Sequence, residues 1–231
     1  MIGTADATVF QSPVYLEARA SRLRNLFHHV APQTLRGRSV LETGCGTGEI
    51  GEEFVRLGCQ VVSVDAVPQY VAELKRNYPN REAHVMDLDN WDPTPLGKFD
   101  IVVCFGLLYH LCRPTAFLAA CARIAGDIFL ETQVCDSEEL SYFLIAEKGA
   151  DQAFSPLGCR PTPGWIRLIM NHFGFEVRDI SSPLANWGGI SPSVFDWEPR
   201  NDGGLVRDGT YLRKMYICSR RRATSQGGGG G

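Results

Sequence analysis

The chain has 231 residues, 44% of them hydrophobic, and its 23 basic and 26 acidic side chains leave a formal charge of -3. This length and apolar content suit one α/β domain with a single core. The charge balance excludes a global attraction to nucleic acid or to an anionic membrane. Its eight cysteines form no Cys-x-x-Cys pair, and no stretch is a secretory signal or approaches the about 20 apolar residues of a membrane span. We therefore expect a cytoplasmic protein with reduced thiols and no metal site.

The N-terminal region predicts an amphipathic helix over residues 12–30. Apolar side chains recur there at helical spacing, with arginines between them, which is typical of a helix with one face on a core. This helix either docks on the sheet or covers the site as a lid.

A strand, a glycine turn, a helix and a second strand are predicted in succession over residues 39–65. Residues 39–43 favour a strand, and glycines at 44, 46 and 48 allow a tight turn and close approach of a ligand to the backbone. The run at 61–64 then delivers Asp65 to the carboxyl end of its strand, about 20 residues beyond the turn, where an acid can bind ribose hydroxyls. The pattern indicates a nucleoside site.

The residues around this turn favour a cationic ligand over a phosphate. A dinucleotide fingerprint needs a small residue where this chain has Glu49, and Glu42 adds negative charge just before the turn. The run Glu42-x-Gly44-x-Gly46-x-Gly48 resembles the first motif of class I S-adenosylmethionine-dependent methyltransferases. The resemblance implies S-adenosylmethionine as the cofactor, which carries an ammonium and a sulfonium, and S-adenosylhomocysteine as the product.

Strands and helices alternate along the rest of the chain, which predicts a doubly wound sheet. We expect further helices at residues 68–78, 114–124 and 162–173, and strands at 83–86, 99–106, 127–132, 175–180 and 211–219. Residues 133–163 are irregular, with one possible helix at 138–147 and loop-forming residues at 154–161.

The resemblance completes the fold prediction: a Rossmann-like, seven-stranded sheet with its last strand antiparallel. It implies a single methyltransferase domain over residues 1–222, with an N-terminal helical lid at 1–38 and substrate-side insertions at 133–163 and 181–210. Residues 223–231 are expected to be a flexible Gly-rich tail.

The expected cofactor-binding residues come from the glycine motif and from the ends of the following strands. In the family, an acid after the third strand meets the adenine amino group and the next residue packs on the ring, which implies Asp87 and Leu88. Asp89 is equally compatible with capping the next turn. The full expected set is Glu42, Gly44, Cys45, Gly46, Gly48, Asp65, Ala66, Asp87, Leu88 and Phe105.

His110 is the candidate general base, because the unperturbed pKa of histidine is close to neutral and His110 follows a strand end that faces the cofactor. Alternatively, this histidine stabilises its loop by forming hydrogen bonds with backbone groups. Tyr109 and Glu131 are second choices, as base or orienting groups. Arg160 could bind an anionic acceptor or pair with a surface carboxylate. Tyr15 and Trp187 are further candidates for substrate binding.

The residues after the fourth strand lower the odds of an exocyclic-amine substrate. Related base methyltransferases often carry Asn/Asp-Pro-Pro-Tyr/Phe there, whereas this chain has Gly106-Leu107-Leu108-Tyr109. We expect methyl transfer to a small molecule, a hydroxyl of a natural product or sugar, by a monomer or homodimer. The alternative is a tRNA- or RNA-modifying alkyltransferase, because Leu-Tyr-His also resembles tRNA wobble-uridine enzymes. A non-catalytic coenzyme-binding protein or a nicotinamide enzyme is a third possibility.

Overall fold

The computed structural model describes residues 7–135, 137–146, 154–182 and 212–221. Its main element is a seven-stranded sheet with the strand order β3-β2-β1-β4-β5-β9-β8. The strands are β1 (Ser39–Thr43), β2 (Gln60–Asp65), β3 (Glu82–Val85), β4 (Phe99–Phe105), β5 (Ala125–Val134), β8 (Phe175–Asp179) and β9 (Leu212–Arg220). The α-helices are α1 (Pro13–His29), α2 (Glu49–Arg56), α3 (Pro68–Asn77), α4 (Pro114–Ile124) and α5 (Pro163–His172). The short 3-10 turns are η1 (Ala7–Gln11), η2 (Pro32–Thr34), η3 (Thr94–Leu96) and η4 (Leu108–His110).

The direction of the strands confirms the predicted fold class. β1 to β5 pair in parallel, whereas β9 is antiparallel to both of its neighbours, β5 and β8. From β1 the chain runs outward through β2 to β3, and it then returns to the centre to form β4 beside β1. The strand order therefore reverses between β1 and β4. In doubly wound sheets, ligands bind at the carboxyl ends of the strands at such a reversal.

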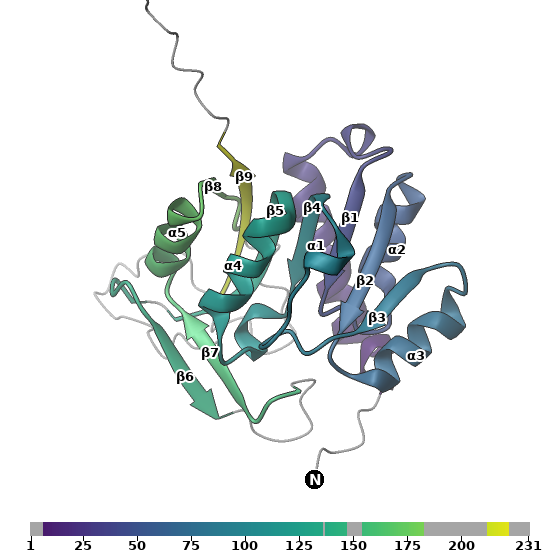
Figure 1. The fold of residues 1–231 in the computed structure, drawn as a ribbon, viewed down its shortest axis with the longest axis horizontal. Helices are drawn as coiled ribbons and strands as arrows, with labels where there is room; N and C mark the ends of the chain where they lie inside the picture. The colour runs from purple at the N-terminus through teal and green to yellow at the C-terminus, as the bar shows by residue number, and fades with distance from the viewer. Residues whose placement is uncertain (1–6, 136, 147–153, 183–211, 222–231) are drawn as a thin grey trace, which may run out of the picture.

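Helices cover both faces of the sheet (Figure 1), because successive strand residues point to opposite sides. On one face Leu41 belongs to the core cluster that includes α4 and α5. On the other face Val40 belongs to the cluster that includes Leu26 of α1 and Phe54 of α2. The predicted N-terminal helix is confirmed, and it docks on the core. α3 packs separately, where Leu74 meets Ala83 of β3.

The prediction of a helix at 138–147 and of a loop at 154–161 was wrong. Residues 142–146 and 157–161 form the two strands of a separate antiparallel sheet, β6 (Tyr142–Ala146) and β7 (Leu157–Pro161). The Tyr142 ring packs edge-on against Trp165, with 5.2 Å between centroids. Aromatic and β-branched side chains favour such strands once a partner is present. The predicted helix start at Thr162 is confirmed, since its hydroxyl caps the Trp165 N–H at 3.2 Å.

Two predicted segments fall largely or wholly outside the described residues. Trp187 and nearly all of the insertion at 181–210 lie there, as does the tail at 223–231. Among the helices that are described, none combines the length and the apolar character needed to cross a membrane.

Candidate active site

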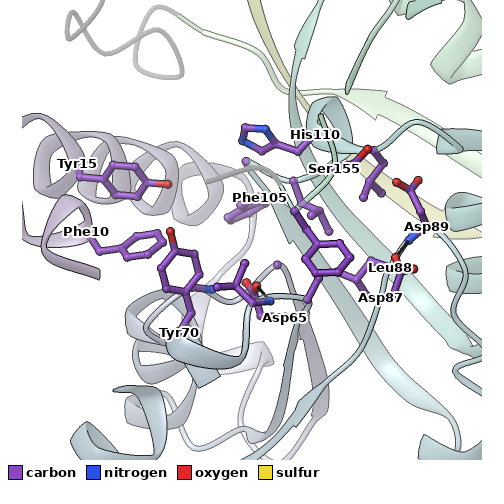
Figure 2. Close-up of a pocket in the computed structure, with 18 residues that line it drawn as sticks. Phe10, Tyr15, Asp65, Tyr70, Asp87, Leu88, Asp89, Phe105, His110 and Ser155 are labelled. Atoms are coloured by element: carbon purple, nitrogen blue, oxygen red, sulfur yellow. Dashed lines mark hydrogen bonds between the residues drawn. The ribbon is translucent and has the colours of Figure 1, made fainter. Parts of the chain in front are cut away.

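A pocket lies at the carboxyl edge of the sheet, beside the reversal between β1 and β4 (Figure 2). The loops after four strands reach it, together with η1, α1 and the segment before β7. The lining residues are Phe10, Tyr15, Gly44, Gly46, Asp65, Ala66, Val67, Tyr70, Asp87, Leu88, Asp89, Phe105, Gly106, Leu107, His110, Leu111, Phe154 and Ser155. Most of the residues predicted to bind the cofactor are therefore brought together.

The glycine turn forms the floor of the pocket. Gly44 and Gly46 have φ angles of 64° and 53°, in the left-handed region that glycine tolerates best. A Cβ on Gly46 would lie 2.7 Å from the Phe10 ring, and one on Gly44 would lie 2.9 Å from the Leu107 side chain. The absence of side chains thus lets neighbouring groups approach the backbone closely.

Asp65 ties the end of β2 to this turn. Its Oδ2 accepts a hydrogen bond from the Gly46 N–H at 2.9 Å, and its Oδ1 accepts one from the Val67 N–H at 2.9 Å. Burial raises the pKa of Asp65 to about 6, although these backbone bonds act in the opposite direction. Because the Gly46 N–H already donates a hydrogen bond to this carboxylate, the turn is a poor binding site for a phosphate.

Glu42 is not among the described residues that line the pocket, and its contact with the cofactor stays a prediction. Its Oε1 accepts from the Gly51 N–H at 2.8 Å, and its Oε2 accepts from the Ser63 hydroxyl at 2.7 Å. Burial raises the pKa of Glu42 to about 7, and the hydrogen bonds from Ser63 and Gly51, with the Arg81 guanidinium at 3.9 Å, only partly offset this effect. Through these contacts Glu42 joins β1, β2 and α2.

Cys45 and Gly48 are also outside the pocket lining. Cys45 is buried in the small cluster around α3, and burial raises the pKa of its thiol. Gly48 is the residue before α2, and its φ of 90° lets the chain enter that helix. Both residues shape the turn rather than its ligand-facing surface.

Three acids from the strand ends face the pocket, and one of them has a second task. Asp87 and Leu88 lie where the resemblance places them, after β3. Asp89 also lines the pocket, and its carboxylate accepts from the backbone N–H groups of Cys112 at 3.2 Å and Arg113 at 2.8 Å. Asp89 thus satisfies amides just before α4 and not in the turn that directly follows it, where its alternative role had placed it. In that turn Asp87 Oδ1 accepts from the Asp89 N–H at 3.0 Å. The place of Asp89 in the pocket was missed.

The aromatic wall of the pocket was only partly predicted. Phe10 meets Tyr15 and Tyr70 edge-on, with centroid distances of 5.0 and 4.9 Å, and Figure 2 shows the three rings gathered on one side. Tyr15 was expected here. Phe10 and Tyr70 were missed, because nothing in their local pattern separates them from ordinary core residues.

His110 lines the pocket at the end of η4, as expected for a group that meets the substrate. Its ring lies 4.0 Å from the ring of Tyr109. Tyr109 itself is buried and outside the lining, and its hydroxyl accepts from Arg213 at 3.2 Å. Its placement supports an orienting role and argues against its being the base.

Glu131 and Arg160 are buried behind the pocket rather than within its lining. Arg22 and Arg213 bind the two oxygens of Glu131. Arg160 donates to the carbonyl oxygens of Tyr109 at 3.3 Å and Cys159 at 2.8 Å. A carboxylate held by two guanidiniums is a poor proton acceptor, which argues against Glu131 as the base. Arg160 is buried and does not lie at the surface.

The charge of the lining defines the ligand that the pocket suits. Among its described lining residues are three aspartates and one histidine, and no lysine or arginine. Such a surface favours a cationic nucleoside over a phosphorylated one. The fold and this site together define a class I S-adenosylmethionine-dependent methyltransferase architecture.

Comparison with known proteins gives the family. A family model described as "Methyltransferase domain" matches residues 15–180, and the chain belongs to this family. It is 34% identical over 190 residues to the ubiquinone biosynthesis O-methyltransferase of Xanthomonas euvesicatoria pv. vesicatoria, covering 75% of this chain and 73% of that protein. Against proteins of the same name from Xanthomonas oryzae pv. oryzae, the match spans less than half of the relative, 44%.

Two further comparisons agree with this result. The tRNA U34 carboxymethyltransferase of Alteromonas mediterranea is 29% identical over 161 residues, which cover 64% of this chain and 48% of that protein. The N-terminal domain of EvdMO1, solved with S-adenosylhomocysteine bound, superposes with a TM-score of 0.64 at 18% identity, covering 89% of this chain and 81% of that one. This likeness confirms the fold expected from the glycine motif.

Proposed function

We propose that this protein transfers a methyl group from S-adenosylmethionine to a hydroxyl of a small-molecule acceptor, in a natural-product, quinone or sugar framework. The observation that carries the proposal is the pocket itself. Its described lining has three aspartates near the ends of strands and one histidine, and it has no lysine or arginine. The O-methyltransferase relatives support the choice of a hydroxyl.

The residues present fit the cofactor. Asp65 offers a buried carboxylate at the end of β2 for ribose hydroxyls, and Asp87 and Leu88 offer an acid and an apolar contact for adenine. Gly44 and Gly46 leave the backbone open to the remainder of the molecule. We infer that the aromatic wall of Phe10, Tyr15 and Tyr70 excludes water from this end, since packed rings leave little room for it.

The bound cofactor supplies an activated methyl group on a sulfonium, so the protein has mainly to align the acceptor and accept a proton. His110 lines the same pocket, and a neutral imidazole there takes the hydroxyl proton as the acceptor oxygen attacks. The proton moves to the ring and leaves with solvent after product release. His110 is thus the proposed general base.

Labelled methyl transfer tests the proposal. The purified protein is incubated with S-adenosyl-L-[methyl-³H]methionine and a panel of catechols, simple phenols and sugars, with calorimetric titration of S-adenosylhomocysteine in parallel. We expect S-adenosylhomocysteine binding, no response to NAD, and label in a hydroxyl-bearing compound. Failure to bind S-adenosylhomocysteine would overturn the cofactor assignment. Label only in amine acceptors would overturn the choice of oxygen.

Transfer of an alkyl group to tRNA is the second candidate. The segment Leu108-Tyr109-His110 and the similarity to a tRNA U34 carboxymethyltransferase favour it. The described pocket lining has no lysine or arginine to hold a phosphate backbone, which favours the small-molecule alternative. Label incorporated into total tRNA, with retention on tRNA that weakens steeply as salt rises, would reverse that order.

A further inference from the structure

The fully buried carboxylate of Glu131 lies at the centre of a charged network behind the pocket. Glu131 is near the carboxyl end of β5, paired with Phe105 of β4 on one side and Met215 of β9 on the other. Its side chain is 0% exposed. A charge in such a place is retained only when it is matched by partners, because desolvating an unmatched ion costs several kcal/mol.

Two arginines from opposite ends of the chain meet this carboxylate, each at its own oxygen. The Arg22 Nε from α1 lies 2.9 Å from Oε2, and the Arg213 Nη1 from β9 lies 2.7 Å from Oε1. Both arginines are buried as well. Burial alone would raise the pKa of Glu131, but the guanidiniums of Arg213 and Arg22 hold it below its ordinary value. Glu131 is therefore an anion that anchors two elements.

One arm of the network leads to the proposed base. The Arg213 Nη2 donates to the Tyr109 hydroxyl at 3.2 Å, and its guanidinium lies 5.1 Å from the centre of the Tyr109 ring. Arg160 lies 5.3 Å from the same ring and donates to the Tyr109 carbonyl. The next residue along η4 is His110, whose ring is 4.0 Å from that of Tyr109. The orientation of η4 thus depends on where Arg213 is held.

The other arm leads to the N-terminal cover of the pocket. Arg22 follows Tyr15 by seven residues, so the two residues lie on the same side of α1, about two turns apart. A Cβ on Gly106, which lines the pocket, would lie 3.3 Å from the Arg22 guanidinium. The Gly106 N–H also donates to the Glu131 carbonyl at 3.0 Å. Arg22 therefore fixes α1 against the loop that leads into η4.

We propose that Glu131 is a positioning residue that couples the seating of α1 over the pocket to the orientation of His110. Its two oxygens hold the two arms, so neither element moves independently of the other. This inference rests on the proposed function, because it assigns Glu131 to the assembly of the same site. The residue acts through Arg22, Arg213 and Tyr109 and does not touch the acceptor.

Hydrogen exchange followed by mass spectrometry tests the coupling, with S-adenosylhomocysteine as the ligand, so that no acceptor is needed. In the parent protein we expect the ligand to slow exchange at residues 65–67, in α1 and in η4 together. In Glu131→Gln, which keeps the shape and removes the charge, residues 65–67 keep their protection. The ligand-induced protection of α1 and η4 falls at least about tenfold.

Single-arm variants keep the test decisive if Glu131→Gln fails to fold. Arg22→Met leaves the carboxylate paired with Arg213, and we expect it to abolish ligand-induced protection of α1 while η4 keeps its own. Glu176→Gln makes the same change at an exposed position on β8 and is expected to behave like the parent.

Two outcomes overturn the inference. One is parental protection of both elements in Glu131→Gln, or of α1 in Arg22→Met. The other is an equal loss everywhere, including residues 65–67, which would mean that the network only stabilises the fold. No ligand-induced protection of residues 65–67 in the parent protein would instead count against the proposed function.

Discussion

The carboxylate of Asp65 accepts the N–H of Gly46 at 2.9 Å, so the acid that ends β2 is bonded directly to the glycine turn that follows β1. The two parts of the nucleoside motif, about 20 residues apart in such sequences, thus form one structural unit. This bond shapes the floor of the pocket before any ligand binds. It also explains why the turn suits an adenosyl cation better than a pyrophosphate.

Asp65→Asn is expected to weaken S-adenosylhomocysteine binding about 10- to 100-fold, because a neutral amide makes weaker hydrogen bonds than a charge-assisted carboxylate. Isothermal titration calorimetry measures the change. Asp92→Asn, at an exposed acid outside the pocket, is the matched control and should bind as the parent does. Equal affinities for Asp65→Asn and the parent would remove Asp65 from the binding site.

Gly46→Ala is expected to cost more stability than Gly37→Ala. Both positions have positive φ, 53° and 80°, which alone costs about 1–2 kcal/mol for a residue with a Cβ. A Cβ on Gly46 would also collide with the Phe10 ring, whereas one on Gly37 would meet nothing within 4 Å. Urea unfolding compares the two variants. Adding Phe10→Leu to Gly46→Ala should recover part of the loss, and a purely additive result would contradict the clash.

Glu42→Gln is expected to change how stability depends on pH. The pKa of Glu42 is raised to about 7 in the folded protein, from 4.5, so the folded state binds the extra proton between these values. This carboxyl therefore lowers the free energy of unfolding as pH rises from about 4.5 to 7, by an amount on the order of a few kcal/mol. The glutamine variant should lose this component of the slope. Unfolding measured at pH 5, 6, 7 and 8 decides, and identical slopes would show that Glu42 does not titrate in this range.

His110→Ala is expected to lower kcat for a hydroxyl acceptor by about 10²- to 10⁴-fold, the range over which a positioned base contributes. Affinity for S-adenosylhomocysteine should stay at the parental value, since the proposed cofactor contacts are other residues. His172→Ala, at the exposed end of α5, controls for loss of a histidine as such. A His110→Ala enzyme with parental kcat would show that the acceptor is deprotonated without this side chain.

The central strands and the residues at their carboxyl ends were predictable because the sequence patterns that indicate them are local. Residues 101–105 are all apolar, as a strand buried on both faces requires, and they belong to β4 at the centre of the sheet. Gly44, Gly46 and Asp65 can be recognised because they lie within one strand-turn-helix-strand unit. Their positions in the pocket therefore followed from spacing alone.

The pairing of β6 with β7 was not predictable because neither segment has a sequence pattern that indicates a strand by itself. Residues 142–146 are apolar without a clear period, which fits a helix or a strand equally well. Their hydrogen bonds go to residues 157–161, where Gly158 and Pro161 indicate a loop. Only the pairing itself, and the packing of Tyr142 on Trp165, decides for a strand.

The partners of Glu42 and Glu131 could not be predicted for a related reason. Both are acids in strands that lead to the ligand edge, and such acids look alike in sequence. Their functions depend on partners that are remote, such as Arg213, which is 82 positions from Glu131. A strand-end carboxylate faces the ligand or the interior according to which cation the fold brings near it.

The position of β9 between β5 and β8 has a consequence for the order in which the molecule is built during synthesis. Until residues 212–220 have left the ribosome, β5 and β8 each lack their shared neighbour and expose backbone groups along one edge. Arg213 arrives on that same strand, so Glu131 stays without one of its two cations until then. The proposed cofactor-binding residues at the ends of β1 to β3 can therefore assemble early in synthesis. By contrast, η4, which carries the proposed base His110, reaches its final orientation only after β9 has been synthesised.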